Sequence, residues 1–313
     1  MVRFAIDERS VDLNGLDVAD ARSALLTFLE RIREVGAEGH GICYDEDLFL
    51  IDLRGGGTFW DLFFPGAELQ LDHEDCERAV AVFGTMPKWH ELSSPQPMDV
   101  EVRIAGGPVE TTGSVAWVHA QGGRGLLAAA CLSAPHGRTP GRHQVLVGGV
   151  DRPVWFVASA KNIECYFRDL LSNFAEAPGD FAALADCAFR DLLFVNNCFD
   201  GIRKMSRVCR DLAPDIVAHL SAFSDAGRRI FSERWQDAQA EFGSLHINIS
   251  DENGATKSDK KAVAERLRIF DGKEMHFWWH SKIEPHRDRI HICPDRVPAG
   301  GKIIVGIFCL HLK

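Results

Sequence analysis

Aromatic, histidine and lysine side chains alternate with other residues along one short segment near the C-terminus. Within Glu274–Ile283, every second position is filled by His276, Trp278, His280 and Lys282. Side chains alternate across a β-strand with a period of two, so these four would share one face of a strand. The other face would be mostly apolar, and we expect it to pack on a helix.

A second segment, Asp288–Cys293, places Arg289 and His291 on one face in the same way. If a short loop joins the two strands, Lys282 lies near Arg289 and His280 lies near His291. Like charges that face each other across a sheet cost energy unless an anion lies between them. The pattern therefore predicts a solvent-facing phosphate site, with an arginine that binds bidentately and a lysine that acts as a point charge.

Two histidines beside a phosphate could cleave RNA without a metal. One histidine would take the proton of a ribose 2′-OH, and a second acid would protonate the leaving oxygen. The two cations would stabilise the developing charge. The predicted catalytic residues are His280, His291, Lys282 and Arg289, and no cofactor is expected. Two alternatives stay open, which are phosphate or nucleic-acid binding without catalysis and a polar face whose histidines pair with carboxylates or water.

More residues are expected to contact nucleic acid. An indole can stack on a base, and a basic run at helical spacing lies next to Asn196 and Asn197. A solvated helix face is the alternative interpretation of that run. The predicted nucleic-acid-binding residues are Trp278, His276, Arg203, Lys204 and Arg207.

A metal site is a further hypothesis, because His276-x-x-x-His280 has the spacing of a helical metal pair. In a strand, however, four residues span about 13 Å, which is too far for one ion. The prediction is therefore that no metal is bound. A zinc site made of His280, His291 and His311 is left as an alternative.

The net charge of -10 is unevenly distributed. Residues 1–150 hold 12 basic and 22 acidic side chains, whereas the last sixty residues hold 12 basic and 7 acidic ones. A uniformly basic protein that coats nucleic acid is thereby excluded. A local basic site near the C-terminus is still compatible with these charges.

Neither the cysteines nor the apolar segments indicate secretion or membrane insertion. Nine scattered cysteines contain no C-x-x-C pair, which predicts reduced thiols that mostly serve as core residues. No apolar run approaches the roughly 20 residues that span a bilayer. The first ten residues carry Arg3, Asp7, Glu8 and Arg9, unlike a signal peptide. We therefore expect a cytoplasmic protein without membrane association.

The pattern of elements predicts the α+β class with three modules. Residues 1–160 read as a β-rich acidic module that includes a helix over Ala19–Val35, and residues 161–242 read as a helical middle. Residues 243–313 read as a small basic α+β module. Its antiparallel sheet is expected to contain Glu274–Ile283, Asp288–Cys293 and Ile303–Leu312.

The final segments, with their W-H-x-K, R-I-H and I-x-V-G-I…H-L patterns, resemble uncharacterised bacterial proteins associated with anti-phage defence. More loosely, the order of elements resembles RelE/HigB-type toxin ribonucleases. The resemblance covers about seventy of the 313 residues. It implies a defence-system component that engages nucleic acid through its C-terminal sheet, with other defence proteins as partners. The alternative is a non-catalytic adaptor that docks a partner enzyme through its N-terminal half. The oligomeric state is left open.

Overall fold

A computed structural model describes residues 2–54, 57–66, 69–92, 100–284 and 287–311. The chain forms two compact units, Met1–Tyr166 and Phe167–Lys313, which we call the N-terminal and C-terminal units. Both combine helices with mixed sheets, and the C-terminal unit holds a helical middle and a small sheet, so the α+β class is confirmed. Within these ranges, no helix has both the length and the apolar character needed to cross a membrane.

The N-terminal unit is built on a seven-stranded sheet. Strands β2, β1, β7 and β9 run parallel, and β8, β5 and β6 continue the sheet with antiparallel pairing. In chain order the strands are β1 (Val2–Ile6), β2 (Gly41–Cys43), β5 (Glu101–Ile104), β6 (Val109–Thr111), β7 (Ala130–Leu132), β8 (Gly141–Val147) and β9 (Val150–Val157).

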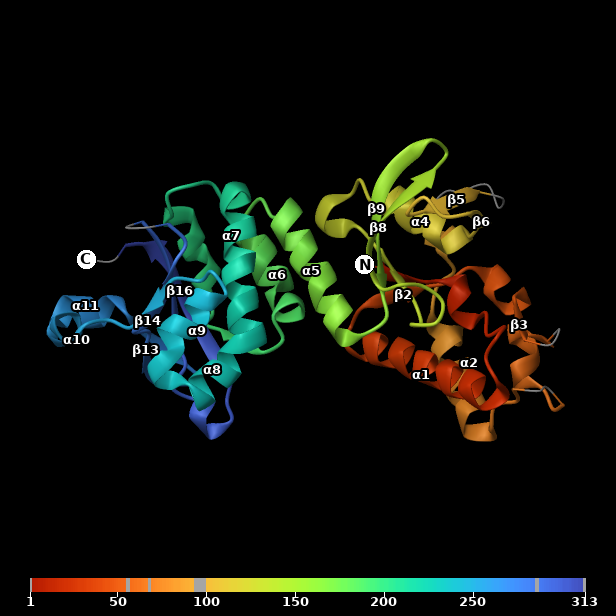
Figure 1. Ribbon diagram of the computed structural model, residues 1–313, viewed down its shortest axis with the longest axis horizontal. Coiled ribbons are helices and arrows are strands. Elements are labelled where there is room, and N and C mark those ends of the chain that lie inside the picture. The colour runs from red at the N-terminus through yellow and green to blue at the C-terminus, as the bar shows by residue number, and fades with distance from the viewer. Residues whose placement is uncertain (1, 55–56, 67–68, 93–99, 285–286, 312–313) are drawn as a thin grey trace. The chain divides into compact units, whose positions relative to one another are not determined.

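Four helices accompany this sheet: α1 (Val18–Ala37), α2 (His73–Thr85), α3 (Trp89–Leu92) and α4 (Gly113–Gln121). The predicted helix over Ala19–Val35 is confirmed as α1, which begins where the Asp17 side chain accepts a hydrogen bond from the Asp20 backbone N–H. Its apolar residues recur at helical spacing and are buried. Helices α1 and α2 lie side by side (Figure 1), and α4 packs on β1, β7 and β9.

The C-terminal unit contains a five-stranded sheet in the order β10-β16-β15-β14-β11. The predicted antiparallel strands form its centre, and β10 adds to one edge in parallel orientation. In chain order the strands are β10 (Leu192–Phe194), β11 (Ile249–Ser250), β14 (Trp279–Lys282), β15 (Asp288–Cys293) and β16 (Ile303–Leu310).

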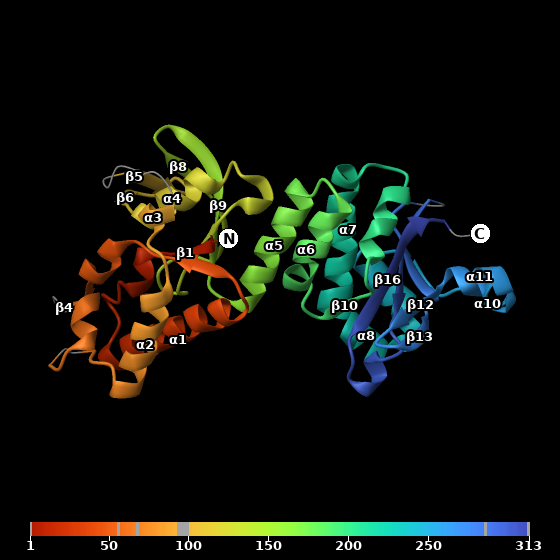
Figure 2. The ribbon, with the colours of Figure 1, turned by 180° about the vertical axis from the view of Figure 1, so that it is seen from behind.

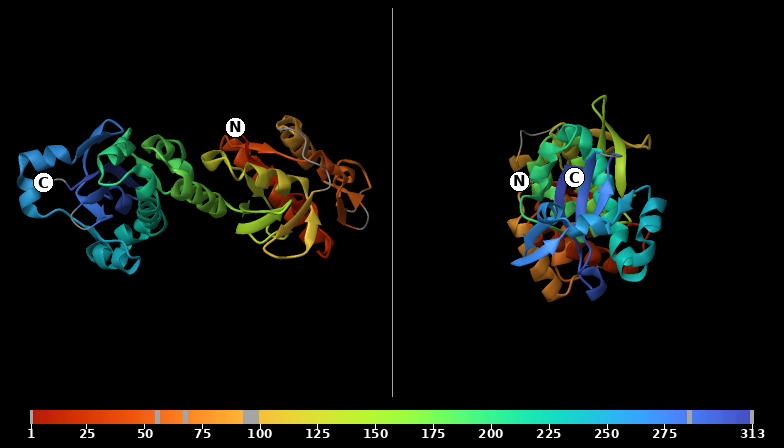
Figure 3. Two further views of the ribbon diagram at one scale, coloured as in Figure 1. Left: turned by 90° about the horizontal axis from the view of Figure 1, so that it is seen from above. Right: turned by 90° about the vertical axis from the view of Figure 1, so that its left-hand side faces the viewer.

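Helices lie on both sides of this smaller sheet. In Figures 1 and 2 the blue strands lie between α6 (Pro178–Ala188) and α7 (Cys209–Ala222) on one side and α10 (Gly254–Ser258) and α11 (Lys260–Glu265) on the other. The view from above in Figure 3 shows the same order. The remaining helices are α5 (Ala160–Phe174), within which the two units meet in sequence, α8 (Arg228–Glu233) and α9 (Ala238–Ser244).

We call the antiparallel pair of β14 and β15 the central hairpin. Its apolar face, continued by β16, packs on helices, as the sequence predicts. The Trp279 ring lies 5.2 Å from that of Phe231 in α8, and the Phe308 ring lies 5.2 Å from that of Phe199. Six of the nine cysteines are also buried, which confirms that most act as core residues.

The opposite face is not solvent-facing, and this prediction is wrong. The expected strand Glu274–Ile283 is interrupted at Phe277 and Trp278. Its first part, β13 (Lys273–His276), pairs with β12 (Leu267–Phe270), and only its second part joins the main sheet as β14. Phe277 packs so closely on β16 that a Cβ atom at Gly306 would overlap its ring. The predicted catalytic side chains are therefore largely covered.

Candidate functional site

The predicted cross-strand pairs are confirmed. His280 lies opposite His291, and Lys282 lies opposite Arg289, in the antiparallel pairing of β14 with β15. The two imidazole centroids are 5.0 Å apart. His280 is 8% exposed, His291 1% and Arg289 3%, so the sheet brings these groups together inside the unit rather than on its surface.

Each histidine is held in place by one ring nitrogen and leaves the other without a hydrogen bond. His291 Nδ1 lies 3.0 Å from the carbonyl oxygen of Phe277, and His280 Nε2 lies 3.1 Å from Ser250 Oγ. The other nitrogens, His280 Nδ1 and His291 Nε2, are buried and have no hydrogen-bond partner among the described residues. Since buried polar atoms normally have partners, these two nitrogens leave room for a further ligand or proton at this place.

A carboxylate completes this group. Glu252 Oε1 lies 3.5 Å from His280 Nδ1, and it accepts a hydrogen bond of 2.9 Å from Arg266 Nε. One ligand atom from each of Glu252, His280 and His291 lies within 4.8 Å of the other two. We call these three residues the Glu–His–His cluster. Two imidazoles and one carboxylate are a donor set suited to a divalent transition metal.

The two histidines are neutral at physiological pH. Burial lowers the pKa of His280 to about 4, although the nearby Glu252 carboxylate opposes the shift. Burial and the proximity of His280 hold the pKa of His291 well below its usual range. A neutral imidazole offers a lone pair to a metal ion or to a proton. Neither ring is the protonated acid that the predicted RNA cleavage would need.

The two cations among the predicted catalytic residues, Arg289 and Lys282, differ in their surroundings. Arg289 Nη1 donates to the carbonyl oxygens of Glu284 and Asp288, at 2.8 and 3.0 Å, so this guanidinium nitrogen is directed at the backbone. Lys282 is only partly buried. The bidentate contact that we expected between Arg289 and a phosphate is therefore not prepared at Nη1.

Trp278 and His276 form a stack beside the cluster. Their ring centroids are 4.9 Å apart with planes inclined by 9°, and the Lys257 ammonium lies 5.8 Å from the Trp278 ring centroid. The indole therefore already has an aromatic neighbour and a cationic one. Stacking of a base on Trp278, as predicted, would have to accommodate these two contacts.

The basic run divides into two parts. Arg203 and Lys204 are exposed at the end of a 3₁₀ helix, Cys198–Lys204, rather than on one continuous α-helix. Arg207 lies after that helix and forms ion pairs with Asp215 and Glu284, at 2.5 and 2.9 Å. Of the three predicted contacts, Arg207 is thus already engaged by carboxylates.

Lys204 lies at a cavity of about 470 Å³ beside β16. Asn196, Asn197 and Arg268 also line it. Asp200 and Glu265 contribute carboxylates to the same cavity. The asparagines and the lysine were predicted from the sequence, but Arg268 was not, because the sequence pattern does not show that β12 lies near β16.

His311 does not join the Glu–His–His cluster. His311 is exposed and follows the end of β16. His291, on β15, pairs with Ile307, which lies within β16 and precedes His311. The alternative zinc site made of His280, His291 and His311 is therefore not assembled, and Glu252 is the third possible ligand near the two buried histidines. Glu252 lies in a polar loop before two short helices, and no pattern in the sequence indicates that it approaches the histidines.

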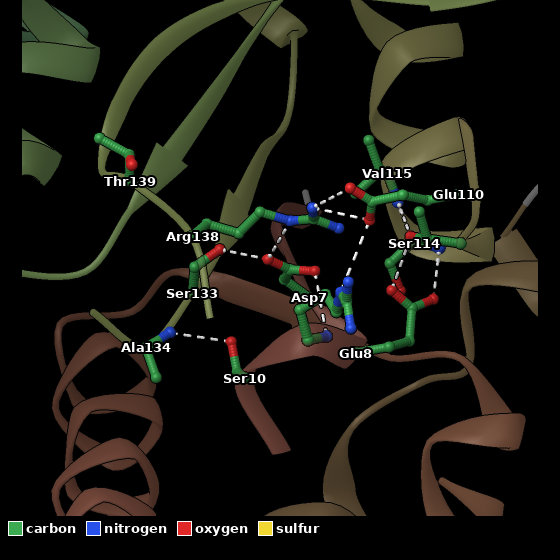
Figure 4. Close-up of polar contacts among 12 residues, drawn as sticks. Asp7, Glu8, Ser10, Glu110, Ser114, Val115, Ser133, Ala134, Arg138 and Thr139 are labelled. Atoms are coloured by element: carbon green, nitrogen blue, oxygen red, sulfur yellow. Dashed lines mark hydrogen bonds and ion pairs between the residues drawn. The ribbon is translucent and has the colours of Figure 1, made fainter. Parts of the chain in front are cut away.

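A second polar cluster lies in the N-terminal unit, at the carboxyl edge of its parallel strands. Asp7 follows β1 and Ser133 follows β7. Figure 4 shows the Arg138 guanidinium between Asp7 and Glu110. Asp7 is fully buried and accepts hydrogen bonds from Ser133 Oγ at 2.8 Å and from Arg138 Nε at 3.1 Å. Arg138 Nη1 also donates to Glu110, at 2.9 Å.

Glu8 is the titratable member of this second cluster. Its carboxylate accepts hydrogen bonds from the Ser114 backbone N–H at 2.7 Å and from Thr112 Oγ1 at 2.8 Å, at the start of α4. Burial, reinforced by the charge of Asp7, raises the pKa of Glu8 to about 7. This cluster was not predicted from the sequence, although an acidic pair directly after a strand is a usable signal for the carboxyl edge of a parallel sheet.

No protein-family model, curated protein or solved structure matches the chain. The function is therefore inferred from the geometry of these sites and from the chemistry of their side chains.

Proposed function

We propose that the C-terminal unit binds nucleic acid through the cavity beside β16. The observation that carries this proposal is that Lys204, Arg268 and two exposed asparagines line one cavity of about 470 Å³, together with the carboxylates of Asp200 and Glu265. A lysine and an arginine attract phosphate, and amide side chains hydrogen-bond to base edges. The excess of basic residues in the last sixty residues supports the same role.

The proposed setting is a bacterial anti-phage defence system, which the resemblance of the final strands implies. Nucleic acid would then be the ligand, and other defence proteins would be partners. Metal-independent ribonuclease activity has less support, because His280 and His291 are buried and their ring centroids lie 5.0 Å apart inside the unit. A ribose and its phosphate need more space than two adjoining buried rings leave.

The test is a binding experiment with labelled single-stranded RNA, single-stranded DNA and duplexes, measured by fluorescence anisotropy over a range of salt concentrations. We expect Lys204→Ala to weaken binding at low salt and to reduce the slope of log K against log salt by about 1. Lys273→Ala is the matched control, because Lys273 is exposed in the same unit but does not line the cavity.

Two outcomes would overturn the proposal. One is no binding of any of the nucleic acids at low salt, and the other is an equal loss in Lys204→Ala and Lys273→Ala. The same labelled RNA, incubated with the protein in EDTA and analysed on a gel, tests the ribonuclease. Cleavage that disappears in His280→Ala would restore that prediction.

A second candidate function, an adaptor that docks a partner enzyme, is favoured by an exposed aromatic patch in the N-terminal unit. Trp60 is 52% exposed and Phe64 48%, and their ring centroids are 5.5 Å apart. Leu50, in the neighbouring 3₁₀ helix Glu46–Leu50, is 71% exposed. Trp60→Ser should abolish co-purification of the partner enzyme from cell extract without altering nucleic-acid binding. Equal recovery with Trp60→Ser would refute this role.

A further inference from the structure

The Glu–His–His cluster brings three possible metal ligands together inside the C-terminal unit. The three ligand atoms lie within 4.8 Å of one another. In a tetrahedral zinc site with bonds near 2.1 Å, ligand atoms are about 3.4 Å apart. Small side-chain rotations would therefore bring the carboxylate of Glu252 and the two imidazoles onto one ion.

The hydrogen bonds of the two histidines match those of metal ligands. In metal sites, the ring nitrogen that does not bind the ion is commonly held by a carbonyl, a carboxylate or a water. His291 Nδ1 has such a bond to the Phe277 carbonyl oxygen, and the contact of His280 Nε2 with Ser250 Oγ serves the same purpose. The other ring nitrogens, His280 Nδ1 and His291 Nε2, are buried and have no hydrogen-bond partner among the described residues. Both histidines belong to the cluster.

An anion is the competing occupant, because Lys282 and Arg289 form the neighbouring cross-strand pair. The carboxylate of Glu252, however, lies 3.5 Å from His280 Nδ1. Arg266 offsets the charge of this carboxylate, so the lone pairs of the rings decide between the two occupants. His291 Nδ1 faces a carbonyl oxygen, which can only accept a hydrogen bond, so His291 Nε2 carries a lone pair that can bind a metal ion and cannot donate to an anion. Arg266 donates to Glu252 Oε1 and so fixes the carboxylate beside the imidazoles while its second oxygen can still bind an ion.

We propose that Glu252, His280 and His291 bind one divalent transition-metal ion, and that zinc is the best match to this donor set. Three protein ligands leave a fourth position of a tetrahedral ion, which a water molecule can fill. The proposed metal site shares no residue with the cavity beside β16, so Zn²⁺ binding and nucleic-acid binding can be tested independently.

The test uses untagged full-length protein that has been stripped with EDTA and then dialysed. Zn²⁺ is titrated by calorimetry, and Co²⁺ is titrated with detection of its visible absorption. We expect one equivalent of Zn²⁺ and the intense Co²⁺ bands of a tetrahedral site. Glu252→Gln and His291→Ala should each bind Zn²⁺ at least tenfold more weakly and lose those bands.

His276→Ala is the matched control, because His276 lies in the same unit, stacks on Trp278 and is outside the cluster. It should bind Zn²⁺ as the unmodified protein does. Glu252→Gln keeps an oxygen that can accept from Arg266, so it separates loss of a ligand from loss of the fold, and its circular dichroism should be unchanged. Sub-stoichiometric binding by the unmodified protein, or unaltered affinity in a folded Glu252→Gln variant, would refute the metal site.

Discussion

Asp7 and Arg138 form a buried ion pair that connects the end of β1 to the segment after β7. Arg138 Nε lies 3.1 Å from Asp7 Oδ2, and the two side chains are 0% and 9% exposed. The same guanidinium also contacts Glu110, at 2.8 Å. Arg138 therefore contacts two carboxylates at the carboxyl edge of the parallel strands, and Arg9 Nε lies 3.6 Å from the second of them, Glu110.

We expect Arg138→Met to destabilise the N-terminal unit by about 3–5 kcal/mol, because it leaves Asp7 buried and uncompensated. The double variant with Asp7→Asn should recover part of this loss. Denaturant unfolding measures both free energies. Arg103→Met, at an exposed position on β5, is the control and should change stability by less than about 0.5 kcal/mol. A loss in Arg138→Met as small as that of the control would contradict the buried pair.

The raised pKa of Glu8 predicts a dependence of stability on pH. The folded pKa of about 7 exceeds the ordinary value of 4.5, so the folded state holds this proton more tightly. Stability should therefore fall as pH rises from 4.5 to 7, by at most about 1.4 kcal/mol per pH unit. Glu8→Gln should remove this fall and be more stable than the unmodified protein above pH 7.

The measurement is denaturant unfolding of both proteins between pH 4 and pH 8. Glu101→Gln removes an exposed carboxylate on β5 and serves as the control. Parallel pH profiles of the unmodified protein and Glu8→Gln would show that Glu8 titrates normally in the folded state.

Gly306 is expected to be essential for the packing of Phe277 on β16. A methyl group there would overlap the ring, so Gly306→Ala should destabilise the C-terminal unit by about 1–3 kcal/mol. It should also weaken Zn²⁺ binding, because the Phe277 carbonyl oxygen holds His291. Gly243→Ala, in α9 with open space around it, is the control. Equal stabilities of the two variants would argue against this packing.

The register of the central hairpin could be predicted because alternation along two adjacent strands fixes which side chains meet. The burial of this hairpin could not be predicted, because it depends on where the preceding strand ends. The predicted strand is interrupted at Phe277, and the β12–β13 hairpin pairs separately. Nothing in the local pattern distinguishes a long strand from two short ones in different sheets.

The third ligand of the cluster could not be predicted either. Glu252 lies outside the sheet strands, in the segment between β11 and α10, and approaches His280 only through tertiary packing. Asp7 and Arg138 likewise meet across more than a hundred residues. Local periodicity identifies faces of helices and strands, whereas sites assembled from separate loops depend on the complete fold.

The buried cysteines give each unit its own chemical reporter. Burial raises the pKa of Cys43 and Cys131 in the N-terminal unit, and it raises the pKa of Cys293 and Cys309 in the C-terminal unit to about 12. Such thiols react with alkylating reagents only when the surrounding structure opens. Mass spectrometry of timed alkylation would therefore measure the opening rates of the two halves of the same molecule in one experiment.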